Sequence, residues 1–355
     1  MYSVDQLLKH VMRVGEVVNP SALVPIAKTI LFGKTDGPNT VLKATDLQTS
    51  IVDNVPQLPY IGFDYCVDAQ KLIQLLKSLK GQKISLKVEN NKFTVISDNG
   101  EYVLPYLPGE EFPEVKIVVG ENEAPAYAFE RALELTKNSV ANDELRPIMC
   151  GVHFDTELGY VVATNGHMLS RYKADFKGDK FTLPIKAYNL LKGYGDASVY
   201  YHVGDNAIHF TIDGGNVDER LQFKITKVEG NYPPYDKVIP TNNPKSFTIN
   251  QADLLDSLKR VSLFAAQDSN SIELDLGAKK IKGVDVNFGN SAEEGLHISF
   301  EEEFSIGLNS KYLIELLNTT GDGQLTFTFS ESNKPVLISN SSNPRMLQLV
   351  MPIQI

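Results

Sequence analysis

The chain alternates between two hydrophobic patterns, and the order of these patterns repeats three times. In six stretches, apolar residues recur every three or four positions opposite a polar face, which is the spacing of an amphipathic helix. Between these stretches, apolar and polar residues alternate as in strands with one buried face. The predicted helices span residues 4–17, 68–80, 128–140, 185–194, 251–264 and 310–317.

Strands are predicted between and after these helices. In the first third of the chain they lie at 30–32, 40–51, 84–88, 92–96 and 102–105. In the middle third they lie at 149–155, 159–172, 198–203, 207–212 and 221–228. In the last third they lie at 272–276, 282–288, 324–329 and 335–339, and an apolar segment at 346–352 closes the chain.

Each third therefore follows the same plan of helix, strands, helix and strands. Repetition over such long segments indicates duplicated domains and not a solenoid of short repeats. We predict an α+β fold with domains at 1–118, 119–242 and 243–355, each with two helices packed on a mainly antiparallel sheet.

One tight turn stands out in the middle third. Asn165-Gly166 follows the apolar run 159–163 and precedes Met168-Leu169, and Asn-Gly is a strong hairpin signal because both residues tolerate positive φ. A comparable unit, Ala44-Thr45-Asp46-Leu47, occurs near the N-terminus. We expect the C-terminal tail to pack beside the turn at Asn165.

Composition sets further limits. The 355 residues are 42% hydrophobic and 22% charged, which is ordinary for globular domains. We expect no membrane span, since no run of about 18 apolar residues occurs, and no signal peptide. Cys66 and Cys150 lie in apolar surroundings without partner spacing, so we expect buried free thiols and a cytoplasmic location.

The charge is unevenly distributed. The net charge is −10, yet the six predicted helices carry twelve Lys/Arg against eight Asp/Glu. A basic helical face on an acidic protein is compatible with contact to DNA phosphates. The alternative is that Lys and Arg occur there because they are good helix formers.

Motifs of catalysis are not found. His167 lies beside Asn165, but neither a Gly-x-Ser-x-Gly elbow nor a Walker-type phosphate loop accompanies it. His202 and His209 lie on neighbouring predicted strands, and two histidines are weak grounds for a metal site. We therefore predict no catalytic residues, no cofactor and no metal.

Several motifs together resemble the bacterial β sliding clamp, a subunit of DNA polymerase III. They are Ala44-Thr45-Asp46-Leu47, Arg146-Pro147 with Gly151-Val152, Ala163 to Leu169, Tyr232 to Pro240, Leu258 to Leu263, Asn309 to Leu313 and Val350 to Ile353. The likeness extends over essentially the whole chain in order. It implies a homodimeric ring of six domains, with helices lining a channel for duplex DNA and sheets outside.

The resemblance also implies that the replicative polymerase, the clamp loader, repair polymerases and mismatch-repair proteins dock short peptides in an apolar cleft. By position, the cleft residues are Met149, Thr164, Gly166, His167, Leu169, Pro233, Lys237, Val238, Leu349, Met351, Pro352 and Ile353. Leu169, Val238 and Met351 would form most of the apolar wall, and Gly166 would allow close approach of a partner backbone.

Two more sets of residues follow from the resemblance. Those facing DNA, which would contact phosphates without reading bases, are Lys9, Arg13, Lys77, Lys137, Arg146, Lys186, Lys192, Lys259 and Lys311. Those in the dimer interface are Lys71 and Tyr102 on one side with Leu263, Phe264, Glu293 and Glu294 on the other. For Leu263 and Phe264, an ordinary place in the core is the alternative.

The chain departs from the family at several positions. Asn165 and Met168 replace a common Asp and basic residue, Lys237 replaces a common Arg, and the chain ends Ile353-Gln354-Ile355. A second interpretation of the whole chain is a clamp-fold, peptide-binding scaffold that no longer encircles DNA. Retention on closed circular DNA distinguishes the two.

Overall fold

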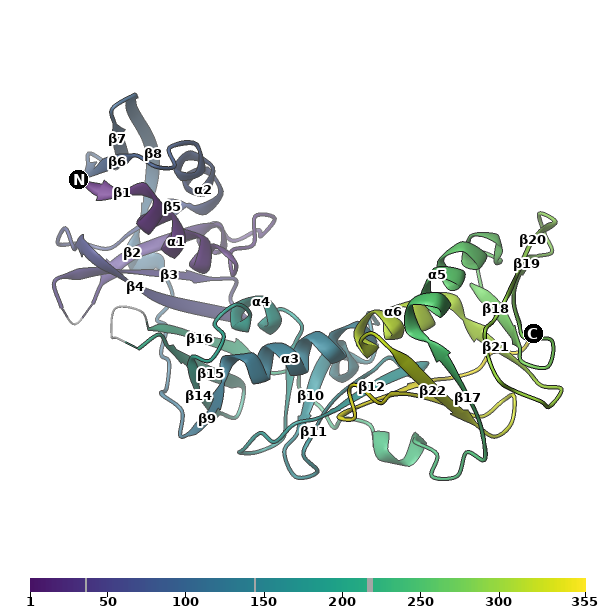
Figure 1. Ribbon diagram of the computed structural model, residues 1–355. Coiled ribbons are helices and arrows are strands. Elements are labelled where there is room, and N and C mark those ends of the chain that lie inside the picture. Colours follow the sequence, from purple (N-terminus) through teal and green to yellow (C-terminus); the bar gives the residue numbers. More distant parts are fainter. Residues whose placement is uncertain (36, 144, 216–219) are drawn as a thin grey trace. The chain divides into compact units, whose positions relative to one another are not determined.

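The structure is a computed structural model that describes residues 1–35, 37–143, 145–215 and 220–355. Within these ranges the chain consists of six consecutive copies of one unit, a strand and a helix followed by three strands (Figure 1). All six predicted helices are confirmed, with ends within a few residues of the predicted ones.

The bounds of the six units follow chain order. The first two are β1 (Tyr2–Ser3), α1 (Val4–Gly15), β2 (Thr29–Lys34), β3 (Asn39–Thr45), β4 (Thr49–Pro59); and β5 (Tyr65–Asp68), α2 (Ala69–Ser78), β6 (Lys83–Glu89), β7 (Lys92–Ser97), β8 (Gly100–Pro108). The next two are β9 (Asn122–Pro125), α3 (Ala126–Thr136), β10 (Gly151–Asp155), β11 (Tyr160–Thr164), β12 (Met168–Lys173); and β13 (Phe181–Pro184), α4 (Ala187–Leu191), β14 (Ser198–Val203), β15 (Ala207–Asp213), β16 (Leu221–Thr226). The last two are β17 (Lys245–Asn250), α5 (Gln251–Val261), β18 (Ser271–Asp275), β19 (Lys280–Asp285), β20 (Asn290–Gly295); and β21 (Ser305–Asn309), α6 (Ser310–Thr320), β22 (Gln324–Phe329), β23 (Val336–Asn340), β24 (Met346–Val350).

The strands that lead directly into the helices were not predicted. They are short, and several end in an Asp or Asn that caps the helix that follows. The side chains of Asp68, Asn250 and Asn309 each accept a hydrogen bond from a backbone N–H in the first turn of α2, α5 and α6. Because the polar cap interrupts the alternation of apolar and polar residues, the hydrophobic pattern does not identify these segments as strands. Strand β20 was also missed, because residues 290–295 contain no large apolar side chain.

The strand pairs of the described residues are antiparallel and form three sheets. The order in the 12-stranded sheet is β1-β6-β7-β8-β5-β2-β3-β4-β16-β15-β14-β9. An 8-stranded sheet has the order β13-β10-β11-β12-β24-β23-β22-β17, and a 4-stranded sheet has the order β20-β19-β18-β21. Together with the helices, these sheets confirm the predicted α+β class.

The chain forms two compact units. One contains Met1–Glu130 and Lys186–Lys227 with the 12-stranded sheet, and the other contains Arg131–Ile185 and Val228–Ile355 with the two smaller sheets. Continuous pairing of β4 with β16, and of β12 with β24, joins strands from different predicted domains. The predicted domain boundaries near 118 and 242 stay a prediction.

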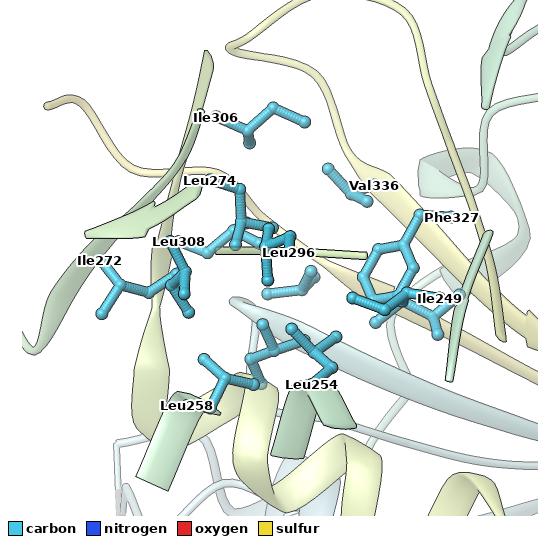
Figure 2. Close-up of a cluster of buried hydrophobic side chains, with 14 of the residues drawn as sticks. Ile249, Leu254, Leu258, Ile272, Leu274, Leu296, Ile306, Leu308, Phe327 and Val336 are labelled. Atoms are coloured by element: carbon cyan, nitrogen blue, oxygen red, sulfur yellow. The ribbon is translucent and has the colours of Figure 1, made fainter. Parts of the chain in front are cut away.

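Helices pack in pairs against the sheets. In the compact unit with the 12-stranded sheet, α1 contacts α2, β3 and β4. In the other compact unit, α5 contacts α6, β17 and β19. Figure 2 shows the core beneath α5, in which Leu254 and Leu258 of the helix meet side chains from several strands. The buried strand residues there are Ile249, Ile272, Leu274, Ile306, Leu308, Phe327 and Val336.

No helix of the described residues is long and apolar enough to cross a membrane. Cys66 is buried and Cys150 is half-buried, and neither forms a disulfide. The prediction that Cys150 is buried was wrong, because it lies in the short 3-10 helix Pro147–Cys150 at the edge of β10. Burial raises the pKa of the Cys66 thiol to about 12.

Candidate functional site

The turn at Asn165 and its N-terminal counterpart have the same hydrogen bonds. Thr164 Oγ1 donates to the carbonyl of Met168 at 2.8 Å, as Thr45 Oγ1 donates to the carbonyl of Thr49 at 2.9 Å. Asn165 Oδ1 accepts from the N–H of His167 and of Met168, and Asp46 Oδ1 accepts from the two equivalent N–H groups. The middle residue has φ of +89° at Gly166 and +77° at Leu47. The predicted equivalence of the two turns is confirmed.

The C-terminal tail lies beside the turn at Asn165, as predicted. Strand β24 pairs with β12, with Leu349 opposite Leu169 and Val350 opposite Met168. Beyond β24, the Met351 N–H donates to the carbonyl of His167 at 2.8 Å. Ile353 then donates its N–H to the carbonyl of Gly307 on β21 at 2.9 Å.

An apolar cluster forms where the tail meets the turn. Its buried members are Val162, Leu169, Tyr235 and Leu349, and its partly buried members are Tyr160, Tyr232, Ile239, Leu337 and Met351. Hereafter this set is called the tail cluster. It brings together Leu169, Leu349 and Met351 from the predicted peptide cleft. Leu169 and Leu349 are buried, so Met351 is the member of these three that presents apolar surface.

Other residues predicted for the cleft surround the tail cluster. Lys237 and Val238 are exposed on the 3-10 helix Tyr235–Val238, whose first residue belongs to the cluster. Pro233 and Pro352 are half-buried on the adjoining segments, and Thr164 is buried in the turn. A Cβ atom on Gly166 would lie 3.9 Å from the Met149 methyl group and 3.2 Å from Arg146 Nη1, so both side chains lie beside the turn.

The His167 side chain packs against α6. Its ring stacks on Tyr312 of α6, with the centroids 5.7 Å apart and the planes 10° apart. Within the described residues, no group of three or more His, Cys, Asp or Glu side chains could hold a metal ion.

Three tyrosines of the tail cluster were missed at the sequence level. Tyr232 and Tyr235 flank Pro233-Pro234, and Tyr160 begins β11. Tyrosine on both sides of a Pro-Pro pair was the available signal, since Tyr is common at binding surfaces.

Polar side chains and a stacked histidine contact two tyrosines of the tail cluster. Tyr235 donates to Asp155 Oδ2 at 3.0 Å, and Lys180 Nζ lies 3.3 Å from Asp155 Oδ1. Burial raises the pKa of Asp155, but the Leu158 N–H, the Tyr235 hydroxyl and the Lys180 ammonium lower it by more. The Tyr232 ring stacks on His153 at 4.4 Å between centroids. Burial lowers the pKa of His153 to about 4.

The residues predicted to face DNA lie mainly on helices. Lys9, Lys77, Arg146, Lys192, Lys259 and Lys311 are exposed, whereas Arg13, Lys137 and Lys186 are half-buried. Lys9, Arg13 and Lys192 line one cavity of about 380 Å³ between α1 and α4. Lys137 and Arg146 line another of about 600 Å³, together with His167 and Tyr312.

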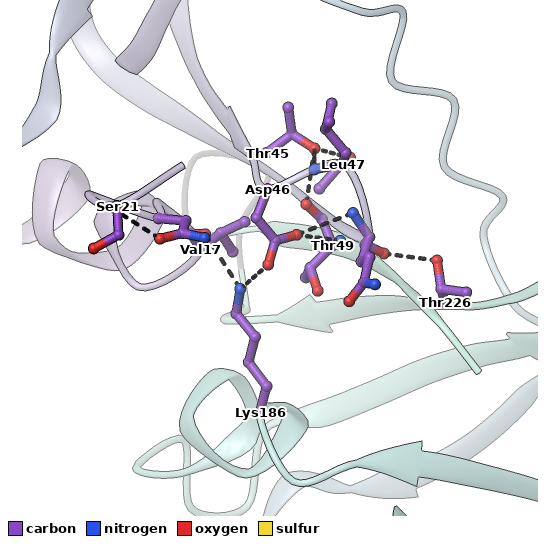
Figure 3. A network of polar contacts seen from close by, with 11 residues as sticks. Val17, Ser21, Thr45, Asp46, Leu47, Thr49, Lys186 and Thr226 are labelled. Carbon is purple, nitrogen blue, oxygen red and sulfur yellow. Dashed lines mark hydrogen bonds and ion pairs between the residues drawn. The ribbon is translucent and has the colours of Figure 1, made fainter. Parts of the chain in front are cut away.

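Lys186 already has strong partners within the chain. Its ammonium forms an ion pair with Asp46 and donates to the carbonyl of Val17 at 3.2 Å, as Figure 3 shows. Asp46 belongs to the N-terminal turn described above. The contact therefore fixes that turn, and it engages the Lys186 ammonium within the chain.

The residues predicted for the dimer interface are accessible. Leu263 is 79% exposed and Phe264 is also exposed, which rules out an ordinary core role for this pair. Glu293 pairs with Lys280, and Glu294 with Arg260 through two contacts of 2.7 Å. Both acidic groups are thus compensated within the chain. Lys71 is exposed on α2 and Tyr102 is half-buried on β8.

Two family models match the chain. The model for the N-terminal domain of the DNA polymerase III beta subunit matches residues 2–116, and that for its C-terminal domain matches residues 236–354. Together the two models cover more than half of the chain. The chain belongs to the beta sliding clamp family.

Known sliding clamps match this chain over nearly its full length. The beta sliding clamp of Proteus mirabilis is 26% identical, with 99% of this chain and 98% of the relative covered. The crystal structure of a sliding clamp from Bartonella birtlesii bound to griselimycin has a TM-score of 0.90 at 24% identity, covering 100% of this chain and 98% of that one. A Pseudomonas aeruginosa clamp, also bound to griselimycin, has a TM-score of 0.88 at 25% identity, covering 99% and 98%.

Membership of the beta sliding clamp family establishes the class of function. The chain is a processivity clamp of DNA replication, as the sequence predicted. Its clamp fold is confirmed over essentially the whole chain.

Proposed function

We propose that two copies of the chain close head to tail into a ring of six domains, at 1–118, 119–242 and 243–355 in each copy, around duplex DNA. The ring tethers the replicative DNA polymerase in the cytoplasm and also serves the clamp loader, repair polymerases and mismatch-repair proteins. The chain itself performs no catalysis, since its role is to keep the polymerase on its template.

A pair of incomplete sheet edges is the observation that carries this proposal. Strand β20 is the first strand of its sheet and pairs only with β19 in the part of the chain that the structure describes. Residues 100–105 of β8 pair with β7 on one side, and β5 pairs only with residues 106–108. Unpaired backbone groups at such edges readily accept another strand. Tyr102 lies on this part of β8, and Leu263 and Phe264 lie on the 3-10 helix Ser262–Phe264, which contacts β20. These residues, with Lys71 of α2, are the proposed interface.

The proposed DNA-facing side is made of helices. Basic residues there would contact phosphates without reading bases, so the ring could slide. The supported members are the exposed Lys9, Lys77, Arg146, Lys192, Lys259 and Lys311, with the half-buried Arg13 and Lys137. The ion pair with Asp46 removes Lys186 from the proposed set.

The tail cluster with its surroundings is the proposed docking site for partner peptides. The partly buried Met351 and the exposed Val238 offer apolar contacts, and methionine adapts to differing side chains. Burial of roughly 300 Å² of apolar surface at about 25 cal/mol/Å² gives ~7 kcal/mol before the cost of ordering the peptide. A micromolar dissociation constant is the matching expectation.

Retention on circular DNA tests encirclement. The clamp is loaded onto nicked circular DNA by its loader, and the DNA is then passed through a sizing column in moderate salt. Encirclement predicts that the clamp stays with the circle and is lost when the DNA is linearised. Equal loss from circular and linear DNA would contradict the proposal and favour a peptide-binding scaffold.

A further inference from the structure

The hairpin between β19 and β20 ends in an unusual tip. Val286 is 86% exposed and Phe288 is 78% exposed, so two large apolar side chains face solvent in the four-residue loop 286–289, which lies between the paired residues Asp285 and Asn290. The loop is well defined, because Asp285 Oδ1 accepts hydrogen bonds from the N–H groups of Asn287 and Phe288. Large apolar groups held in a fixed turn and exposed to water usually mark an interaction site.

A second apolar surface lies beside the free part of β8. Phe63, which is 40% exposed, packs against Tyr65 and Tyr106 with ring centroids 5.8 and 6.0 Å apart. Tyr106 directly follows the segment of β8 whose second edge is unpaired. Tyr102, Leu104 and Tyr106 share one face of β8, since side chains alternate along a strand. Phe63 and Tyr106 are called the aromatic patch below.

Strand direction decides whether the tip reaches this patch. The strand pairs of the described residues are antiparallel, and antiparallel pairing is also the commoner arrangement generally. If β20 of one copy lies antiparallel along residues 100–105 of another, the residues before β20 extend toward Tyr106. Parallel pairing would instead place the tip at Ser97, Asp98 and Asn99, which are polar. Only the antiparallel arrangement brings apolar side chains to apolar side chains.

Charge gives an independent reason for an apolar anchor. Glu293 and Glu294 on β20 are already paired with Lys280 and Arg260 of the same chain. They are therefore poorly placed to bind Lys71 of a second copy. Apolar contact at the tip supplies attraction that these compensated carboxylates do not.

We propose that Val286 and Phe288 of each copy dock on the aromatic patch of a second copy and anchor the ring at both of its closures. This inference rests on the proposed ring, because it needs β20 of one copy to lie against β8 of another. The occupant of the patch is a second copy of this chain.

The test is the dissociation constant of the dimer, measured by sedimentation velocity on the full chain. Phe288→Ser removes only an exposed side chain, so folding is preserved. We expect this variant to raise the dimer dissociation constant at least tenfold. Leu158→Ser is the matched control, since Leu158 is an exposed apolar residue in the β10–β11 turn, and it should change the constant less than twofold. Phe63→Ser should weaken the dimer as Phe288→Ser does, and the double variant should be little weaker than either single variant.

Different failures have different meanings. A dimer that is unchanged by Phe288→Ser but split by Leu263→Asp would overturn the tip anchor and leave the ring standing. Weakening by Phe288→Ser with no coupling to Phe63→Ser would place the tip elsewhere and also overturn the inference. A wild-type chain that is monomeric at tens of micromolar would contradict the ring itself.

Discussion

The backbone N–H of Met351 lies 2.8 Å from the carbonyl oxygen of His167 and donates a hydrogen bond to it. This bond continues the pairing of β24 with β12 past the end of the strand. It holds the tail against the turn without using the Met351 side chain, which packs in the tail cluster. Support and binding surface are thus provided by different atoms of one residue.

Met351→Ala should therefore reduce peptide binding without releasing the tail. We expect a labelled Gln-Leu-x-Leu-Phe peptide to bind the wild type with micromolar affinity and the variant at least tenfold more weakly, about 1.4 kcal/mol. Fluorescence anisotropy measures both constants. Gln354→Ala, an exposed change in the same tail, should leave the affinity unchanged. Equal affinity for wild type and Met351→Ala would remove the tail cluster from the docking site.

The two equivalent turns should respond oppositely to substitution. Gly166 has φ of +89°, where a Cβ is strained, so Gly166→Ala should lower the free energy of unfolding by about 1–2 kcal/mol. Leu47 adopts φ of +77° with an exposed side chain, so Leu47→Gly relieves strain at the cost of chain entropy. We expect a change between zero and about 1 kcal/mol of stabilisation. Urea unfolding measures both, and a clear loss of stability in Leu47→Gly would show that the turn does not strain that residue.

The sequence predicted regular structure well where periodicity extended over several turns or strands. All six helices fall in this class, as do the two hairpin turns whose Thr and Asx residues supply the hydrogen bonds. The strands before the helices were missed because they are short, and a capping residue such as Asn250 ends three of them.

Contacts across long separations were beyond sequence patterns. The stacking of His167 on Tyr312 depends on where α6 packs. Pairing of Glu293 with Lys280 depends on the register between β19 and β20. Met168, where the family often has a basic residue, is explained by its burial in the core beneath α5. The tertiary packing that decides these contacts is specified by many residues at once.

Substitutions of Lys186 and Lys77 should distinguish a structural lysine from a DNA-facing one. Lys186 holds Asp46 and the carbonyl of Val17, so Lys186→Met leaves a half-buried carboxylate without its partner. We expect a loss of about 1–2 kcal/mol of stability and an unchanged salt dependence of DNA binding. Lys77→Ala, an exposed change on α2, should do the reverse and lower the slope of log affinity against log salt by about one phosphate contact. A reduced slope in Lys186→Met would return this residue to the DNA-facing set.

Stability should fall in mildly acidic solution because of His153. Burial lowers its pKa to about 4, whereas the unfolded chain has the ordinary value of about 6.5. Between these values the unfolded state binds a proton that the folded state does not, so the free energy of unfolding decreases as pH falls through this window. From pH 7 to pH 5 the expected loss is about 2 kcal/mol. His153→Gln cannot titrate but can still bond Thr182 Oγ1, which lies 3.0 Å from His153 Nδ1. Urea unfolding at both pH values should show the loss in the wild type and little of it in the variant, whereas parallel losses in the two proteins would assign the pH dependence to other groups.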